Sequence, residues 1–512
     1  MARNFKVLQV SGQDMTSAFQ DKSGTEWHYV SADAVLREDD SVREVLIDKG
    51  PFEFIYVEMP YSEVLMTFLA AFSEPYTTYI DQAYWDDDYA QHPMTHRYLI
   101  RPFIYQSMEE RSEKLQAVTF PGQYGDKISP KFCMLQRPFE GISHYDGNNA
   151  FVVSGDFGDT MTPLLTWQRY QHYDKDKVIQ VWPEYTLTGD VDVEFVFRLV
   201  PMHATDTVDE VFVKSHAELT TPLEISRRPY EAHIIINMRA KGNGTIRMGA
   251  VHKRWSRLDM GQFILGGERY VDADRSEFIH YFHPGDMKPP LNVYFSGYHS
   301  AQGFEGYFMM KRMKAPFILI ADPRVEGGAF YLGSETYERA IKKVIQDGLD
   351  RLGFQPEELI LSGMSMGSFG ALYYGAQLNP AAIIAGKPLI NVGTVAENMP
   401  RVRPEDFGTS LDILRKNEGS LTPEAITHLN DKFWQQFNQA DFTNTTFAIA
   451  YMAHDDYDKH AFDMLLPILS RQQARIMQRS IPGRHNDDTP TIASWFKNFY
   501  HMILESQFGR EQ

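Results

Sequence analysis

The chain contains 512 residues, of which 43% are hydrophobic and 23% are charged, so it has enough apolar material for two or three packed domains and is not disordered throughout. Its 50 basic and 68 acidic residues give a formal net charge of −18, which argues against broad nucleic-acid binding because it would repel a polyphosphate. The single cysteine, Cys133, excludes an intramolecular disulfide and a metal site built from several thiolates.

The apolar residues are too scattered for a membrane-spanning helix, which needs about 18 to 20 of them in succession. This distribution of apolar residues does not exclude peripheral contact with a membrane. The first residues turn polar at Ser11 and lack the apolar stretch of a signal peptide. We therefore expect a cytoplasmic protein, free in the cytosol or peripheral at the cytoplasmic membrane.

Residues 1–145 are predicted to form a small α/β region. The segments 6–10 and 53–57 are apolar runs of strand length, and 62–72 has helical spacing. The acidic aromatic stretch 84–89 (YWDDDY) carries three carboxylates that are candidate ligands for a divalent cation. A solvated loop is the commoner outcome for such a run, so we predict no metal site.

Residues 146–285 are predicted to form an antiparallel β-sandwich, because side chains alternate between apolar and polar along segments such as 191–197 (VDVEFVF). Gly242 and Gly244 separate two apolar runs and predict a tight hairpin turn. The region is a candidate glycan-binding module if its aromatic side chains are exposed, although burial in the core is the default for such residues. The aromatic candidates for stacking on sugar rings are Trp167, Tyr170, Tyr173, Trp182 and Trp255.

Residues 283–290 (HPGDMKPP) combine breakers of helices and strands, and they indicate a boundary before a third domain, 286–512. Within this domain, apolar runs of strand length alternate with segments of helical spacing. The predicted strands are 291–295, 316–321, 358–362, 381–385, 446–452 and 474–481, and the predicted helices are 334–352, 367–378, 423–437, 457–469 and 491–506. Such alternation indicates a mainly parallel sheet with helices on both faces.

A G-x-S-x-G motif at 363–367 directly follows the predicted strand 358–362 and precedes a helix that begins with small residues. In α/β-hydrolases this pattern forms a sharp turn that exposes the serine in a strained conformation, and the glycines let strand and helix approach without clashing Cβ atoms. Ser365 is therefore the candidate nucleophile. The alternative is a glycine-lined turn with a solvated serine.

A serine hydroxyl becomes nucleophilic when an imidazole takes its proton and a carboxylate holds that imidazole in one tautomer. In α/β-hydrolases these partners follow in the order Ser, acid, His, each in a loop after a strand. Asp455, after the strand 446–452, is the first choice for the acid and Asp456 the reserve; both could instead cap the next helix. His485, after the strand 474–481, is the predicted base, and an unpaired surface histidine is the alternative.

The oxyanion of an acyl-transfer intermediate needs fixed hydrogen-bond donors, usually the backbone N–H after the nucleophile and a second from a loop after an early strand. Met366 supplies the first. The strand 291–295 runs into a glycine-bearing loop, Ser296-Gly297-Tyr298, which lacks the glycine run of the HGGG type. We predict the N–H of Tyr298 as the second donor.

Together with the opening segment 6–10 and the central strands, the segments 363–370 (GMSMGSFG) and 483–486 (GRHN) give a sequence that resembles the accessory secretory protein two family of the accessory Sec system. That system serves export of serine-rich-repeat adhesins in Gram-positive bacteria. The resemblance implies an α/β-hydrolase-like O-acetyltransferase domain that modifies N-acetylglucosamine on the adhesin. It carries the triad onto Ser365, Asp455 and His485.

The resemblance also implies complexes with two sister accessory Sec proteins and cooperation with the accessory Sec motor ATPase. We expect no tightly bound cofactor, but acyl transfer requires an acetyl donor, which the sequence does not identify. Two other functions use the same residues. One is a carbohydrate esterase or deacetylase with the same triad, and the other is a non-catalytic export factor built on a hydrolase scaffold.

Overall fold

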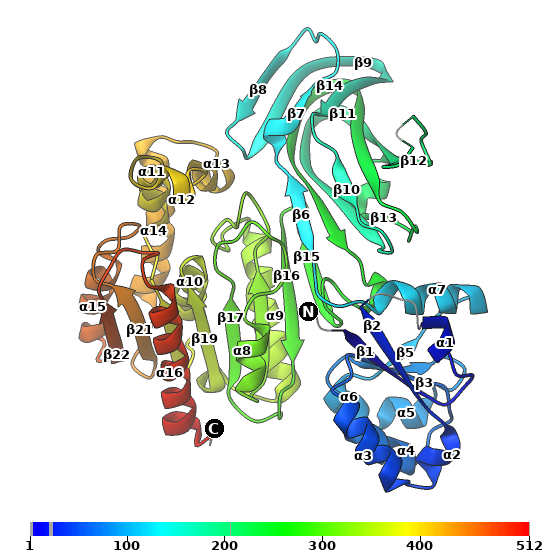
Figure 1. Cartoon of the computed structure of the whole chain (residues 1–512). Coiled ribbons are helices and arrows are strands. Elements are labelled where there is room, and N and C mark those ends of the chain that lie inside the picture. The colour runs from blue at the N-terminus through cyan, green and yellow to red at the C-terminus, as the bar shows by residue number, and fades with distance from the viewer. Residues whose placement is uncertain (1–3, 20–23, 205, 511–512) are drawn as a thin grey trace. The chain divides into compact units, whose positions relative to one another are not determined.

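The computed structural model describes residues 4–19, 24–204 and 206–510, which divide into two compact units (Figure 1). The first unit holds the described residues of 1–123 together with 176–178 and 255–267. The second holds 124–175, 179–254 and 268–512, again within the described ranges. Among these residues, no helix combines the length and the apolar composition needed to cross a bilayer.

The first unit is built on a five-stranded parallel sheet in the order β2-β1-β3-β4-β5. Successive residues of β1 face opposite sides of the sheet, so that Leu8 packs with Leu65 of α4, whereas Val7 packs with Leu115 of α7. The strands are β1 Phe5–Val10, β2 Thr25–Val30, β3 Phe54–Val57, β4 Thr78–Asp81 and β5 Arg101–Phe103, and the helices are α1 Thr16–Phe19, α2 Ala32–Leu36, α3 Asp40–Lys49, α4 Glu63–Ala70, α5 Asp87–Gln91, α6 Pro93–Tyr98 and α7 Met108–Val118. The acidic stretch 84–89 lies here, and Asp86 in it caps α5 by accepting from the Tyr89 N–H.

The second unit begins with a nine-stranded sheet, which we call the sheet module. Its strands are β6 Gly125–Ile128, β7 Cys133–Leu135, β8 Ile142–Asp146, β9 Ala150–Trp167, β10 Gln171–Tyr173, β11 Ile179–Pro201, β12 Glu210–Ser215, β13 Leu223–Ile225 and β14 Ala232–Trp255. The antiparallel strands predicted here are present, but hydrogen bonds join all nine into one sheet rather than the two sheets of a sandwich. The module also takes in 125–146, so the boundary predicted at residue 145 differs from the structure, in which the first segment of the first unit ends at 123.

The predicted hairpin at Gly242 and Gly244 is wrong, because both glycines lie inside the continuous strand β14. A Cβ on Gly242 would stand 2.1 Å from the carbonyl oxygen of Asp190, and one on Gly244 would stand 2.2 Å from that of Thr188. The register against β9 also shifts at Gly242. The glycines therefore permit a close approach between β14 and β11 at a bulge, not a chain reversal.

The aromatic residues proposed for sugar stacking are mostly interior. Trp167, Tyr173 and Trp182 are buried, and Trp255 is half-buried and belongs to the first unit. Tyr170 is 56% exposed and is the one side chain of the five that stands open to solvent. Burial, the default for such residues, is therefore the outcome for Trp167, Tyr173 and Trp182, and these three offer no exposed ring for sugar stacking.

The remainder of the second unit, which we call the α/β module, contains an eight-stranded sheet in the order β15-β16-β18-β17-β19-β20-β21-β22. Strand β16 is antiparallel to β18, and the strands from β18 to β22 are parallel. The strands are β15 Gly267–Val271, β16 Glu277–His283, β17 Leu291–Phe295, β18 Phe317–Ala321, β19 Leu359–Met364, β20 Ala382–Gly386, β21 Thr446–Met452 and β22 Arg475–Ile481. Because β15 and β16 belong to this sheet, the module begins before the predicted boundary at 285/286.

Helices cover both faces of this sheet, as the sequence predicted. Alternate residues of β17 point to opposite sides: Val293 lies in the core shared with α9 and α10, whereas the Tyr294 ring contacts Phe496 of α16 at 6.1 Å between centroids. The helices are α8 Tyr307–Arg312, α9 Glu335–Leu352, α10 Met366–Leu378, α11 Val392–Val402, α12 Pro404–Phe407, α13 Leu411–Glu418, α14 Pro423–Gln439, α15 Ala461–Arg471 and α16 Thr489–Phe508. Helices α11–α14 form an insertion between β20 and β21, which we call the cap.

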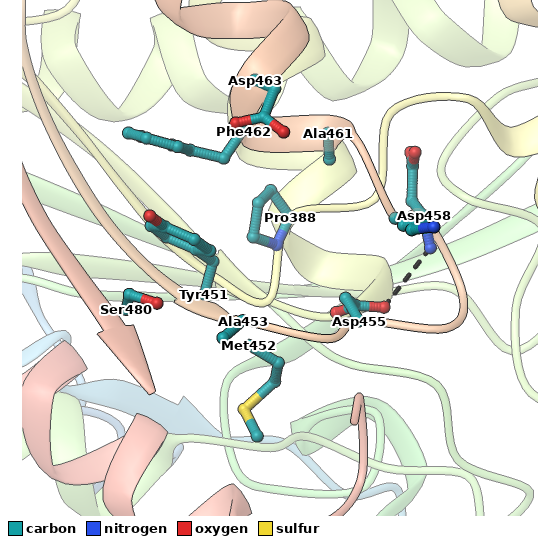
Figure 2. A pocket seen from close by; sticks show the side chains of 11 residues that line it. Pro388, Tyr451, Met452, Ala453, Asp455, Asp458, Ala461, Phe462, Asp463 and Ser480 are labelled. Carbon is teal, nitrogen blue, oxygen red and sulfur yellow. Dashed lines mark hydrogen bonds between the residues drawn. The ribbon is translucent and has the colours of Figure 1, made fainter. Parts of the chain in front are cut away.

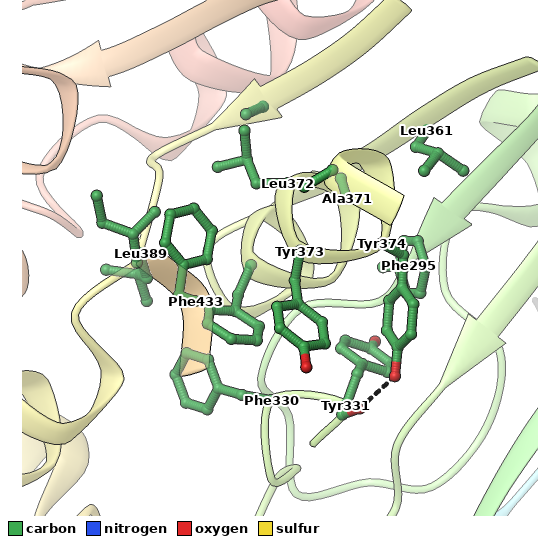
Figure 3. Packing of buried hydrophobic residues seen from close by; sticks show 14 of the residues in the cluster. Phe295, Phe330, Tyr331, Leu361, Ala371, Leu372, Tyr373, Tyr374, Leu389 and Phe433 are labelled. Atoms are coloured by element: carbon green, nitrogen blue, oxygen red, sulfur yellow. Dashed lines mark hydrogen bonds between the residues drawn. The ribbon is translucent and has the colours of Figure 1, made fainter. Parts of the chain in front are cut away.

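Figure 3 shows how α10 is buried between the sheet and the cap. The ring of Tyr374 on α10 stacks on Phe295 of β17, with 5.7 Å between centroids, and the Tyr374 hydroxyl donates to the Tyr331 carbonyl at 2.7 Å. On the other side, Phe369 contacts Phe433 of α14. The helix that follows the candidate nucleophile is therefore fixed from two sides.

Candidate active site

Ser365 occupies a strained turn between β19 and α10. Its backbone lies at φ 54° and ψ −121°, a conformation that a non-glycine residue adopts only when its surroundings impose it. The flanking glycines allow it: a Cβ on Gly363 would stand 2.1 Å from the carbonyl oxygen of Gly367, and one on Gly367 would stand 2.0 Å from that of Phe295. The Ser365 N–H donates to the Gly386 carbonyl at 2.8 Å and ties the turn to β20.

His485 lies in the turn after β22 and meets both of its predicted partners. Its Nε2 is 2.9 Å from Ser365 Oγ, and its Nδ1 is 2.8 Å from Asp455 Oδ2. The side chain is 1% exposed. The imidazole therefore bridges the serine hydroxyl and the aspartate carboxylate. The three residues lie in loops at the carboxyl ends of three parallel strands, in the chain order of an α/β-hydrolase.

The structure separates the two candidate acids. Asp455 faces the imidazole, and its other oxygen, Oδ1, accepts from the backbone N–H groups of Tyr457 at 2.9 Å and Asp458 at 3.3 Å. Asp456 instead accepts from the backbone N–H of His485 at 3.2 Å and from Arg403 Nε at 2.6 Å. Burial opposes ionisation of Asp456, but these two donors outweigh it and lower its pKa. Asp456 thus holds the histidine loop and ties the cap to it.

Among the described residues, the backbone N–H groups of Met366, at the start of α10, and of Tyr298 have no hydrogen-bond acceptor. The loop that carries Tyr298 lies against the nucleophile turn, since a Cβ on Gly297 would stand 3.4 Å from the Met364 carbonyl oxygen. The N–H of Gly297 is engaged by Glu305 Oε2 at 2.8 Å. Neither predicted donor is therefore committed to a backbone acceptor in the described part of the chain, and the neighbouring Gly297 N–H helps to hold the loop.

Sequence reasoning missed the aromatic support of the histidine. The ring of Tyr457 stacks on the His485 imidazole with 4.1 Å between centroids and 10° between planes. Its hydroxyl accepts from Asn486 Nδ2 at 3.1 Å, and the ring of Phe407, in the cap, also stacks with it at 6.2 Å between centroids. Tyr457 stands two residues after Asp455, and no sequence pattern marks it as a partner of a residue 28 positions further on.

A lysine that sequence reasoning also missed lies buried beside the acid loop. Lys387 follows β20, is 5% exposed, and donates from Nζ to Thr489 Oγ1 at 3.2 Å. Burial lowers its pKa, and the nearby carboxylates of Asp455 and Glu305 partly oppose that effect. A cationic group therefore sits within the electrostatic reach of the carboxylate that faces His485.

A cavity of about 220 Å³ opens on the far side of the acid loop (Figure 2). Asp455 forms part of its wall, while neither Ser365 nor His485 lines it. Its other walls include Pro388 and the stacked rings of Tyr451 and Phe462, which are 4.4 Å apart between centroids. This cavity is therefore distinct from the position at which an acyl group would meet the serine.

A metal centre finds no support in the described part of the chain, where no three His, Cys, Asp or Glu side chains are grouped to hold an ion. Cys133 is buried in the sheet module, and burial raises the pKa of its thiol. The polar groups that converge on Ser365 are those of a proton-transfer site.

Comparison with known proteins assigns the family. Residues 5–510 match the family described as Accessory Sec system GspB-transporter. Accessory Sec system protein two of Staphylococcus aureus (strain NCTC 8325 / PS 47) is 55% identical over 517 residues, covering 100% of this chain and 99% of the relative. Its counterpart in Streptococcus gordonii is 40% identical over 403 residues, covering 78% of each chain.

A solved structure supports the same assignment. A chain described as part of the Glycosylation Associate Protein (Gap123) complex from Streptococcus agalactiae is 35% identical, covers 100% of both chains and superposes with a TM-score of 0.89. The family model, the Staphylococcus aureus relative and this structural likeness each extend over essentially the whole chain. The chain therefore belongs to the accessory Sec system protein two family.

Proposed function

We propose that this accessory Sec protein is a serine-dependent O-acetyltransferase that modifies N-acetylglucosamine on a serine-rich-repeat adhesin. The observation that carries the proposal is the continuous hydrogen-bonded line from Ser365 Oγ through the His485 imidazole to Asp455. A line of this kind converts a weakly nucleophilic hydroxyl into one that attacks an acyl carbon.

In the first half-reaction, Ser365 Oγ attacks the carbonyl carbon of an acetyl donor while His485 Nε2 takes the hydroxyl proton. The carbonyl oxygen becomes an oxyanion and receives hydrogen bonds from the N–H groups of Met366 and Tyr298. Collapse of the intermediate expels the donor's leaving group, which takes the proton from His485. Asp455 remains ionised and stabilises the imidazolium in between.

In the second half-reaction, a sugar hydroxyl attacks the acetyl-serine, passes its proton to His485 and leaves as the acetyl ester, and Ser365 recovers its proton. Water competes with the sugar for the same carbon. A bound hydroxyl has an effective concentration that solvent cannot match, and a base that is 1% exposed limits the access of water. Both features favour transfer over hydrolysis.

The proposal extends to partners and location. Because the similar chain from Streptococcus agalactiae belongs to a Gap123 complex, we propose that this chain likewise assembles with two sister accessory Sec proteins. It would act in the cytoplasm, in solution or peripheral at the membrane, on adhesin that the accessory motor ATPase then exports. The reaction requires an acetyl donor that is not tightly bound, and we propose no nucleic-acid partner.

The experiment compares intact masses of adhesin glycans from cells that make wild-type protein, Ser365→Ala or the control Ser470→Ala, which changes an exposed serine on α15. We expect whole acetyl units to disappear in Ser365→Ala and to persist in the control. Retained acetylation in Ser365→Ala refutes the transferase and leaves a non-catalytic export factor. Purified protein that releases acetate without transferring it to glycan identifies an esterase instead.

A further inference from the structure

The loop that carries Tyr298, residues 296–306, is held at its far side by the sheet module. Gln302 in this loop is 5% exposed, and its amide lies between two side chains of β14. Arg254 Nε donates to Gln302 Oε1 at 2.7 Å, and Gln302 Nε2 is 2.5 Å from His252 Nδ1. The backbone N–H of Gln302 also donates to the Gly125 carbonyl of β6 at 2.9 Å.

The donors and acceptors in this contact admit one arrangement. An arginine only donates, so the Gln302 oxygen must face Arg254 and the amide NH₂ must face His252. His252 Nδ1 then accepts, and its Nε2 carries the ring proton toward Glu184 Oε1, 2.9 Å away. Each polar group therefore fixes the orientation of the next, and the amide cannot turn over without breaking two buried hydrogen bonds.

The residues that hold Gln302 are themselves immobilised. Arg254 makes a two-pronged ion pair with Glu277, which is fully buried and also accepts from Arg269. His252 is fully buried as well. Glu184, whose Oε1 lies 2.9 Å from His252 Nε2, has a side chain that is only 12% exposed. Gln302 is thus attached to a rigid, charged cluster rather than to a mobile surface.

Tyr298 lies between two points at which the loop is attached: Gln302, which contacts β14, and Gly297, which is bound by Glu305. Before it, the Gly297 N–H is held by Glu305 Oε2 at 2.8 Å. After it, the His299 N–H donates to the Gly327 carbonyl at 3.4 Å, and the chain then reaches Gln302. Gln302 is therefore only four positions along the chain from Tyr298, in the loop that lies against the nucleophile turn.

We propose that Gln302 is a positioning residue through which the sheet module holds the Tyr298 N–H in place for the oxyanion. This inference rests on the acyl-transfer mechanism above. It gives the sheet module a role in catalysis that requires no sugar-stacking surface. It also predicts that a change in β14 near Arg254 is felt at Ser365, although β14 contributes no group to the reaction.

The test uses the full chain with Gln302→Met, which keeps the length of the side chain and removes the amide contacts to Arg254, to His252 and to the Asp126 carbonyl. Two readouts are followed: steady-state hydrolysis of p-nitrophenyl acetate, and hydrogen exchange of the peptide that spans 296–306. We expect kcat to fall about 10- to 100-fold with KM within about twofold, because a misplaced donor weakens the transition state more than ground-state binding. Exchange in 296–306 should accelerate, while α10 stays protected.

The matched control is Asn237→Ala, which removes contacts to Arg198 and Thr166 within the sheet module. It should leave both readouts at their wild-type values. Gln302→Glu is a milder second variant that keeps the acceptor for Arg254 and loses the donor to His252, and its effects should be intermediate. Unchanged kcat and unchanged exchange in the Gln302 variants, or equal losses in Asn237→Ala, overturn the inference.

Failure of the proposed function is seen separately. If Ser365→Ala hydrolyses the ester as fast as the wild type, the acyl-transfer mechanism is refuted. The exchange measurement still decides whether Gln302 holds the loop, since it requires no turnover.

Discussion

Replacing Asp455 by asparagine is expected to leave the fold intact and to remove most of the catalytic rate, because the change reverses the tautomer of His485. Asp455 Oδ1 accepts from two backbone N–H groups, and Oδ2 faces His485 Nδ1. In the variant, those backbone donors require the amide oxygen at the Oδ1 position. The amide NH₂ then faces Nδ1, the ring proton moves to Nε2, and Ser365 has no base.

The expected loss is roughly 10⁴-fold in kcat, equivalent to about 5.5 kcal/mol of transition-state stabilisation. KM should change by less than about threefold, because the buried carboxylate acts through His485. Asp456→Asn is the matched control. Its contacts to the His485 N–H and to Arg403 do not set the tautomer, so kcat should fall by less than about tenfold.

The assay is hydrolysis of p-nitrophenyl acetate by purified variants, with thermal unfolding to establish that each is folded. Nitrogen NMR of labelled histidine reports the tautomer of His485 directly. The reasoning is refuted if Asp455→Asn keeps more than about a tenth of the wild-type kcat, or if Asp456→Asn loses more activity than Asp455→Asn.

Three further changes test separate parts of the structure. Tyr457→Leu removes the ring stacked on His485 and should lower kcat about tenfold in the same assay, whereas Tyr457→Phe should keep most of it. The pKa of Glu184 is lowered from 4.5 to about 2 in the folded protein. This shift stabilises the fold above about pH 4.5 by roughly 3 kcal/mol, and the contribution is lost as the pH falls toward 2. Glu184→Gln should therefore flatten the pH dependence of urea unfolding between about pH 5 and pH 3. Gly367→Ala should lower the thermal unfolding temperature or prevent folding, because its Cβ would stand 2.0 Å from the Phe295 carbonyl oxygen.

The site could be predicted from the sequence because its residues occupy positions that the sheet defines. Loops after parallel strands share one edge, so Ser365, Asp455 and His485 were candidates once the strands before them were recognised. The choice between Asp455 and Asp456 could not be made that way. Asp455 and Asp456 are adjacent in one loop, so both stand at the same place in the order of serine, acid and histidine. Only the folded structure shows which of the two carboxylates turns toward the imidazole.

Long-range contacts account for what the sequence did not reveal. Gly242 sits between two apolar runs, as a turn residue does, yet the carbonyl of Asp190, far away in the chain, is the reason a glycine is needed there. Gln302 likewise shows no motif, because its role depends on β14 side chains about 50 residues earlier. The strands 267–283 were placed in the wrong sheet since alternation alone does not identify a strand's neighbours.

The placement of the base in the turn that follows β22 has a thermal consequence. Strand β22 ends the order of the eight-stranded sheet, and nearly all its residues are exposed or half-buried, whereas β19, with the nucleophile turn at its end, is central and almost wholly buried. Fraying of a peripheral strand needs less free energy than melting of the whole domain. Mild heating should therefore separate the His485 imidazole from the Ser365 hydroxyl while the nucleophile turn keeps its native structure. Activity should be lost at a lower temperature than cooperative unfolding, and it should return on cooling.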